Sequence, residues 1–318
     1  MSPFHEGECA VQARVGVREK MAEIGPRLIR DAMPEQHRAF FSQLPFVIVA
    51  ALDGADQPWA AALAAPPGFI TAPSPQRLLV RALPQEHNPL KQALLPGRPI
   101  ALLGIEPHTR RRNRANGLIE SVANDGIAVS VQQSFGNCPK YIQARQPHYV
   151  GDGGTASKLL QHSKQLSPAA RALIRAADTF FIATAHPAAP TDDAGRHGAD
   201  VSHRGGKPGF VRVEKDGTLL VPDFSGNRFF NTLGNIAAHP HAGLLFIDFS
   251  NGDLLHLAVD AEIIWEGPVL QSFAGAERLL RFRVREMQHV KDMLPLRWSE
   301  AEPSPFLAGT GSWPDSTT

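Results

Sequence analysis

The chain has 318 residues, enough for two ordinary domains, and its 43% hydrophobic and 20% charged residues are typical of soluble globular proteins. A formal net charge of +1 argues against strong attraction to nucleic acid or to an anionic membrane surface. Two cysteines, Cys9 and Cys138, are too few for a disulfide framework and suit a reducing compartment. Since the sequence has neither a stretch of roughly 20 apolar residues nor a secretory signal, we expect a cytoplasmic protein without membrane contact.

The elements expected in chain order form an N-terminal extension, residues 1–32, and a first folded unit, residues 33–146. A polar, glycine-rich linker, residues 147–167, leads to a second unit, residues 168–300, and a flexible tail, residues 301–318, ends the sequence. The 27 glycines and 27 prolines predict many short elements joined by turns, which favours β structure.

The two units resemble each other. PEQHRAFFSQLPFVIVA at 34–50 aligns with PAARALIRAADTFFIAT at 168–184, so that Phe46 falls on Phe180 at an offset of 134 residues. PPGF and RLLV match KPGF and TLLV at an offset of 141, and IALLGIE matches AGLLFID at 142. Matches in the same order at a nearly constant offset indicate a duplication, with about seven extra residues in the second copy within 186–206. The short apolar strands of each copy must pair or close, which predicts a small closed or split barrel per copy.

The second copy contains a candidate anion site in the stretch VPDFSGNRFFNTLGNIAAHP, residues 221–240. A phosphate is bound well by backbone N–H groups at a helix N-terminus together with a hydroxyl and a cation. The turn offers these groups in Ser225, Gly226, Asn227 and Arg228, and Asn231 and Asn235 lie four apart on one face of the following helix. The alternative is a capped helix with a surface arginine.

The first copy provides an internal comparison for this turn. Its matching stretch, RALPQEHNPLKQAL, keeps Asn88 opposite Asn231 but carries Pro84 and Glu86 and has no Ser-Gly pair. The anion site is therefore expected to be lost in the first copy.

Other polar residues leave alternatives open. His203, Arg204 and Lys207 in SHRGGKPG fit an anion contact or a mobile surface loop, and Arg212 needs a partner because it interrupts an apolar strand. The arginines at 110–112 and 114 fit a ligand or partner contact or a solvated turn, and the near-neutral chain without interleaved aromatics argues against nucleic acid. The spacing of His186, His197 and His203 matches no usual ligand pattern, so no metal is expected. Cys138 is expected to be a structural residue rather than a reactive thiol.

The turn D-F-S-G-N-R, followed by N-x-x-x-N and His239-Pro240, resembles the pyridoxamine 5'-phosphate oxidase-like FMN-binding split-barrel family. GFVRV at 209–213 stands where that family contacts the flavin, and EPHTRRRNRANG at 106–117 resembles the stretch with which a partner barrel reaches it. The fold implied is mainly β with flanking helices (α+β), as two tandem split β-barrels that form an intrachain pseudo-dimer. The FMN-binding residues implied are Arg112, Asn113, His203, Lys207, Val211, Arg212, Asp223, Phe224, Ser225, Gly226, Asn227, Arg228, Asn231 and Asn235.

The resemblance implies FMN as cofactor and suggests an FMN-dependent oxidoreductase that moves hydride or electrons between a small-molecule donor and acceptor. No side chain stands out as a catalytic acid or base. One alternative is a non-catalytic flavin-binding or electron-carrier module for a separate reductase, and another is a degenerate barrel pair without flavin. Whether two chains pair as a homodimer is left open.

Overall fold

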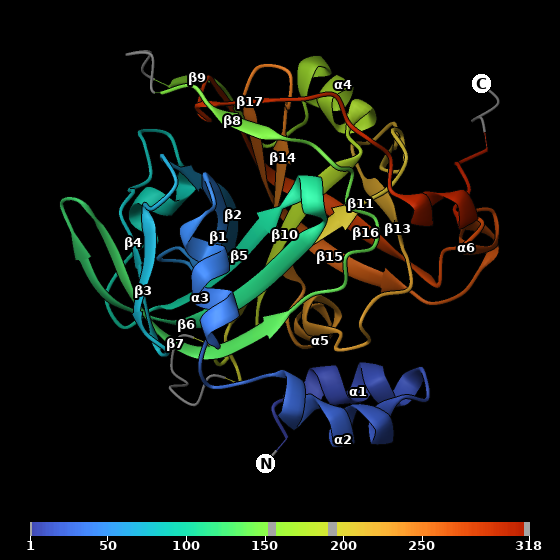
Figure 1. Cartoon of the computed structure of the whole chain (residues 1–318). Helices are drawn as coiled ribbons and strands as arrows, with labels where there is room; N and C mark the ends of the chain where they lie inside the picture. The colour runs from blue at the N-terminus through green and yellow to red at the C-terminus, as the bar shows by residue number, and fades with distance from the viewer. Residues whose placement is uncertain (1, 152–156, 190–195, 315–318) are drawn as a thin grey trace.

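The computed structural model describes residues 2–151, 157–189 and 196–314, and its two large antiparallel sheets follow one another in the chain (Figure 1). The strands of the first barrel are β1 (Phe46–Leu52), β2 (Pro58–Ala64), β3 (Ile70–Ser74), β4 (Arg77–Val80), β5 (Pro99–Glu106), β6 (Arg111–Ala123) and β7 (Gly126–Gly136). Helix α3 (Glu35–Ser42) precedes them, the short helix η1 (Pro89–Gln92) lies between β4 and β5, and η2 (Pro107–Thr109) follows β5.

The second barrel repeats this series. Its strands are β10 (Thr179–Ala185), β11 (Ala199–Gly205), β12 (Arg212–Val213), β13 (Leu219–Asp223), β14 (His241–Ile247), β15 (Leu254–Ile264) and β16 (Arg278–Lys291). Helix α4 (Pro168–Ala176) precedes the strands, α5 (Asn231–Ala238) takes the place of η1, and α6 (Pro268–Gln271) lies between β15 and β16. The hydroxyl of Ser167 caps α4 by accepting from the N–H of Ala170, at 3.1 Å.

The two sheets have the same strand order, β2-β1-β5-β6-β7-β4-β3 in the first and β11-β10-β14-β15-β16-β13-β12 in the second. Since each strand of one sheet has its counterpart at the same place in the other, the expected duplication and the mainly β fold of two tandem split barrels are confirmed. The matching turns agree in detail, because Gly68 and Gly209 both have positive φ, 95° and 85°, in the PGF segments.

One part of the sequence alignment was wrong by a residue. Phe180 faces the core of the second barrel, but Phe46 faces the other barrel, and Val47 is the residue that faces the core of the first. The helix–strand segments therefore correspond at an offset of 133, from Val47 to Phe180, rather than 134. A shift of one residue turns every side chain of a strand to the opposite face, so burial identifies the register where two similar aromatic residues do not.

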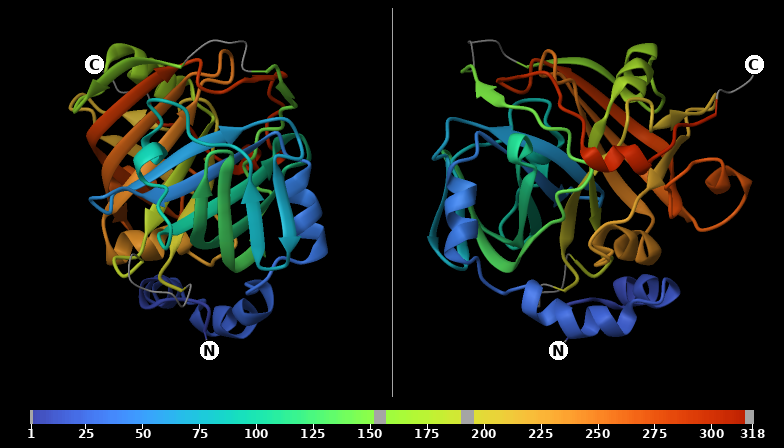
Figure 2. Two further views of the ribbon diagram at one scale, coloured as in Figure 1. Left: turned by 90° about the vertical axis from the view of Figure 1, so that its left-hand side faces the viewer. Right: turned by 45° about the vertical axis from the view of Figure 1, so that its right-hand side comes forward.

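Strand alternation builds three apolar layers. Val47, Val49 and Leu102 belong to the core of the first barrel, and Ile182 and Leu244 to the core of the second. The opposite faces of β1, β2, β5, β10, β11 and β14 form a third cluster that joins the barrels (Figure 2). At this contact Gly243 leaves no space for a side chain, because a Cβ would lie 2.3 Å from the carbonyl oxygen of Pro58.

The remaining segments pack on the barrels. Helices α1 (Glu6–Arg14) and α2 (Arg18–Leu28) lie beneath α5, on the same side of the molecule (Figures 1 and 2). Residues 147–167, expected to be a linker, include β8 (Pro147–Tyr149), which pairs with β17 (Leu296–Trp298), and β9 (Lys158–Ser163), which pairs with β16.

The expected tail also has structure as far as residue 314. It forms the short helix η3 (Pro305–Gly309), and the indole N–H of Trp313 donates to the carbonyl of Phe210 at 2.8 Å. Residues 315–318 lie outside the described part of the chain. None of the described helices is both long enough and apolar enough to cross a membrane.

Candidate functional site

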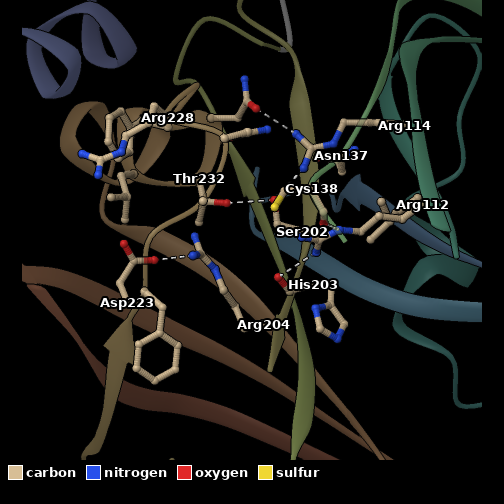
Figure 3. Close-up of a pocket in the computed structure, with 17 residues that line it drawn as sticks. Arg112, Arg114, Asn137, Cys138, Ser202, His203, Arg204, Asp223, Arg228 and Thr232 are labelled. Atoms are coloured by element: carbon tan, nitrogen blue, oxygen red, sulfur yellow. Dashed lines mark hydrogen bonds and ion pairs between the residues drawn. The ribbon is translucent and has the colours of Figure 1, made fainter. Parts of the chain in front are cut away.

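A cationic pocket lies where β6 of the first barrel meets β11 and the 223–230 turn of the second (Figure 3). Arg112 and Arg114 lie two residues apart on the same face of β6. Three consecutive residues of β11, Ser202, His203 and Arg204, also line the pocket, and Cys138 follows just after β7. The cavity has a volume of about 90 Å³. It is lined by Leu103, Arg112, Arg114, Asn137, Cys138, Ser202, His203, Arg204, Asp223, Phe224, Gly226, Asn227, Arg228, Phe230, Asn231, Thr232 and Leu233.

A second, smaller cavity of about 60 Å³ adjoins the first. Both cavities contact Arg112, Cys138, His203, Arg204, Phe224 and Gly226. Tyr141 and Ser225 line only the second cavity, where the rings of Tyr141 and Phe224 lie 5.0 Å apart. The two cavities together form a groove that both cations and aromatic rings line.

Three of the four pocket arginines are paired with carboxylates. Arg114 pairs with Asp200, Arg204 pairs with Asp223, and Arg228 pairs with Glu277 at 2.8 Å. These pairs hold the guanidinium groups in place, and they also neutralise charge that a ligand would otherwise meet.

Arg112 is different from the other three. In the described part of the chain its hydrogen bonds go to backbone carbonyls, to Cys138 at 2.7 Å and to His203 at 3.4 Å. Burial lowers the pKa of Arg112 to about 10, so that the group stays charged at neutral pH. A desolvated cation without a carboxylate partner is costly unless an anion binds it. Arg112 is therefore the strongest signal in the pocket for an anionic ligand.

A buried polar network links the pocket to helix α1. The carboxylate of Glu8 accepts from the side chain of Asn231, whose oxygen accepts from Arg114 at 3.3 Å. Burial, and then the charge of Asp200, raises the pKa of Glu8 well above its ordinary value. Burial also raises the pKa of Asp200, against the opposing effect of Arg114. One buried cation thus faces two buried carboxyl groups.

His203 contributes a neutral imidazole to the pocket. Its pKa is held well below the ordinary value by burial and then by the charges of Arg112 and Arg204. Of the three candidates in SHRGGKPG, Arg204 is thus the cation at the pocket. Lys207 lies outside the lining and donates instead to the carbonyl of Thr310 at 2.6 Å.

The 223–230 turn has a strained backbone. Arg228 and Phe230 have φ of 66° and 64°, in the left-handed region that residues with a Cβ seldom occupy. The side-chain oxygen of Asn227 accepts from the N–H of Phe229 at 3.1 Å, and α5 then begins at Asn231. A Cβ added at Gly226 would meet no atom within 4 Å, so the glycine is not required by packing within the chain.

The structure brings most of the expected binding residues together. Those that line one or both cavities are Arg112, His203, Asp223, Phe224, Ser225, Gly226, Asn227, Arg228 and Asn231. Those that do not are Asn113, Lys207, Val211, Arg212 and Asn235. That any of these residues binds FMN stays a prediction.

The residues outside the lining have other contacts. Asn113 lies between Arg112 and Arg114 and points to the other face of β6, and Val211 is part of the second barrel core. Arg212 pairs with Glu214 at 2.6 Å and stacks on Trp313, which supplies the partner that an arginine in an apolar strand needs.

Asn235 is buried just below the pocket. Its amide donates to the hydroxyl of Thr184 at 3.1 Å and to Asp200 at 3.3 Å. The expectation that it shares a helix face with Asn231 holds, because both side chains reach the network around Arg114 and Asp200.

Sequence reasoning did not identify Ser202, Thr232 and Asn137 as lining residues. The hydroxyl of Thr232 donates to that of Ser202 at 3.0 Å, and the Ser202 hydroxyl accepts from Arg114 at 2.6 Å. Thr232 could have been found as a member of the first turn of α5, but nothing in the sequence places Ser202 beside an arginine 88 residues earlier.

The pseudo-symmetry of the barrels shows how the site differs between the two copies. By strand register, Leu254 and His256 on β15 correspond to Arg112 and Arg114 on β6. By the same comparison, Ala61, Ala62 and Leu63 on β2 correspond to Ser202, His203 and Arg204 on β11. At the equivalent positions, Arg112, Arg114 and Arg204 are thus replaced by Leu254, His256 and Leu63.

Comparisons with known proteins give a limited result. No family model and no curated protein matches the chain. Among solved structures it is similar to HupZ of Group A Streptococcus, at 14% identity over 38% of this chain and 90% of that one, with a TM-score of 0.30. A Lactobacillus delbrueckii protein provisionally named a pyridoxamine 5'-phosphate oxidase is 14% identical, over 41% and 98%, with a TM-score of 0.31. HutZ of Vibrio cholerae, named a heme storage protein, is 12% identical, over 40% and 93%, with a TM-score of 0.26. At these values the similarity carries no argument about ligand or activity.

Proposed function

We propose that the protein is an FMN-binding flavoprotein that holds one flavin in the cationic groove between its barrels. The observation that carries the proposal is Arg112, a charged guanidinium at the groove whose hydrogen bonds within the described residues go to backbone carbonyls. A phosphate would supply the anion that this group lacks, in the bidentate geometry that arginine favours. The D-F-S-G-N-R turn, on which the family resemblance rests, lies directly opposite in the lining.

The residues present fit such a ligand in chemistry. Arg112, Ser225 and the first turn of α5 would hold the phosphate, and the rings of Phe224 and Tyr141 would offer apolar contact to the rest of the molecule. Sites for ligands of this size commonly enclose about 300 Å³ or more, so the ring system would extend beyond the two cavities. Bound FMN would supply hydride or electron transfer, while the protein binds and orients it.

The proposal implies one flavin per chain. A second site would have to form at the pseudo-symmetric position, where Leu254 replaces Arg112 and Leu63 replaces Arg204. Those apolar side chains offer no charge to a phosphate.

The absorption spectrum of the purified protein, with flavin counted per chain, tests the proposal. A flavin spectrum at one FMN per chain, or stoichiometric uptake of added FMN, supports it. A colourless protein that takes up no FMN contradicts it, as does the spectrum of a bound haem or a count of two flavins per chain.

A catalytic role and a carrier role remain two versions of this function. The only carboxylate that lines the described groove, Asp223, is already paired with Arg204 and Arg278, which favours a non-catalytic electron carrier for a separate reductase. Turnover of the FMN-loaded protein with NADH or NADPH and a small acceptor would establish the oxidoreductase instead.

A further inference from the structure

A second candidate site lies away from the groove, where helix α1 meets the connection between β10 and β11. That connection spans thirteen residues, 186–198, against five, 53–57, for the corresponding connection in the first barrel. Histidines stand near both of its ends, at His186 and His197, and His5 and Glu6 approach them from the start of α1. We call these four residues the His–Glu cluster.

The three imidazole rings gather around the carboxylate of Glu6. The Nε2 atom of His186 lies 2.8 Å from one oxygen of Glu6, and the Nε2 atom of His197 lies 3.3 Å from the other. The ring centroid of His186 lies 4.8 Å from that of His5 and 4.3 Å from that of His197. One ligand atom each of His5, Glu6 and His186 lies within 4.8 Å of the others.

One ring nitrogen of the cluster makes no hydrogen bond in the described part of the chain. His5 is 97% buried, and its Nδ1 atom accepts from the N–H of Gly7 at 3.1 Å. Its Nε2 atom is buried without a hydrogen bond and lies 3.6 Å from the carboxylate of Glu8. A buried ring nitrogen that lacks a hydrogen bond is costly, and its position beside two further imidazoles points to a ligand.

We propose that the His–Glu cluster binds a divalent transition-metal ion of the zinc type. Three imidazoles and one carboxylate are a donor set that zinc accepts in tetrahedral sites. With bonds of roughly 2 Å, tetrahedral ligand atoms lie roughly 3.3 Å apart, close to the spacings around Glu6 and reachable for His5 by small side-chain shifts. The sequence spacing of His186, His197 and His203 argued against a metal. That argument does not apply to this cluster, because His5 and Glu6 at the start of α1 supply two of the four ligands and His203 lies elsewhere.

Binding requires a change of tautomer at two rings. The Nδ1 atoms of His5 and His186 accept from the N–H groups of Gly7 and Ala188, so the ring proton that each carries before an ion binds resides on Nε2. Ligation through Nε2 moves that proton to Nδ1 and exchanges the two backbone contacts for metal bonds. The side chain of Glu6 is 71% exposed, which gives an ion a route from solvent.

The metal would tie α1 to the second barrel. Glu8, two residues after Glu6 on α1, accepts a hydrogen bond from Asn231 in the lining of the groove. An ion at the His–Glu cluster would therefore also stabilise the position of Asn231 in the groove lining, whether or not a flavin binds there.

Titration of the full chain, freed of any affinity tag, with Co²⁺ alone tests the proposal. We expect one Co²⁺ per chain with the visible absorption bands of a four-coordinate N/O site, displacement of these bands by Zn²⁺, and a higher melting temperature with Zn²⁺. The variants Glu6→Gln and His197→Ala should each weaken Co²⁺ binding by at least about tenfold. Both positions are partly or largely exposed, so these variants should keep the circular dichroism of the parent protein.

A matched control is His162→Ala. His162 Nε2 lies 2.8 Å from Glu286, the same distance as in the His186–Glu6 pair. This second pair lies on the surface, apart from the His–Glu cluster. This variant should bind Co²⁺ like the parent. The proposal is overturned if the parent shows no four-coordinate bands and no shift in melting temperature, or if Glu6→Gln binds Co²⁺ as tightly as the parent does. Neither result would bear on flavin binding, which the absorption spectrum tests separately.

Discussion

The sharpest prediction concerns Arg112 and the phosphate of the flavin. The change Arg112→Gln keeps a hydrogen-bonding side chain on β6 but removes the groove guanidinium whose partners, within the described residues, are backbone carbonyls. Riboflavin lacks the phosphate and is otherwise the same ligand. The parent protein should therefore prefer FMN to riboflavin, and the variant should lose most of that preference while it binds riboflavin nearly as before.

The expected size follows from the contact that is lost. A hydrogen bond to a charged group contributes about 1.5–3 kcal/mol. Since every 1.4 kcal/mol changes an affinity about tenfold, the Kd for FMN should rise about 10- to 150-fold. The remaining arginines of the groove are paired with carboxylates, and Lys140, which lines the smaller cavity, lies over the ring of Phe306, so these cations should not make up for the loss.

Quenching of flavin fluorescence on titration with protein measures all four affinities, for two ligands and two proteins. The matched control is Arg111→Gln, because the neighbouring arginine is exposed on the other face of β6, with its guanidinium 5.0 Å from the ring of Phe40. An FMN-to-riboflavin ratio that is the same in Arg112→Gln and in the parent would refute the reasoning, as would an equal loss in the Arg111 variant.

Three further predictions concern stability. Asp200→Asn removes the carboxylate paired with the buried Arg114 and should cost about 3–5 kcal/mol in urea unfolding, and a loss below 1 kcal/mol would mean that the pair is not desolvated. Burial lowers the pKa of His256 from 6.5 to about 4. Because the unfolded chain then takes up this proton more readily than the folded one, the free energy of unfolding falls by up to about 3 kcal/mol as the pH falls from 6.5 toward 4. His256→Asn should flatten the fall of the melting temperature between pH 7 and 4, and an unchanged slope would place the effect elsewhere. Gly243→Ala forces a Cβ against a backbone carbonyl of β2 and should cost about 1–3 kcal/mol, whereas Gly54→Ala, in an open turn, should cost much less, and equal effects would contradict close contact between the barrels.

The repeat and its strands could be read from the sequence because they depend on local patterns. The PGF turns, the RLLV and TLLV strands and the IALLGIE and AGLLFID strands correspond in the structure at the offsets expected. Apolar periodicity and turn glycines act over a few residues, so a single sequence displays them. The same holds for the position of the 223–230 turn, which departs from its counterpart in the first copy.

The faces of the strands and the partners of the charges were decided by tertiary structure. Sequence similarity placed Phe46 on Phe180, but burial turns these two side chains to different faces. Arg228, expected to be the cation for the phosphate, pairs with Glu277, whereas Arg112 is the groove arginine without a carboxylate. Contacts between distant segments decide which arginines are paired with carboxylates, so local sequence patterns cannot predict these pairs.

The His–Glu cluster makes the same distinction most clearly. Spacing along the chain argued against a metal because it compared histidines within one segment. The structure brings His5 and Glu6 to His186 and His197 across about 180 residues of sequence, a separation that no motif spans. Local secondary structure can thus be predicted from the sequence, whereas a site assembled from distant segments forms only when the chain folds.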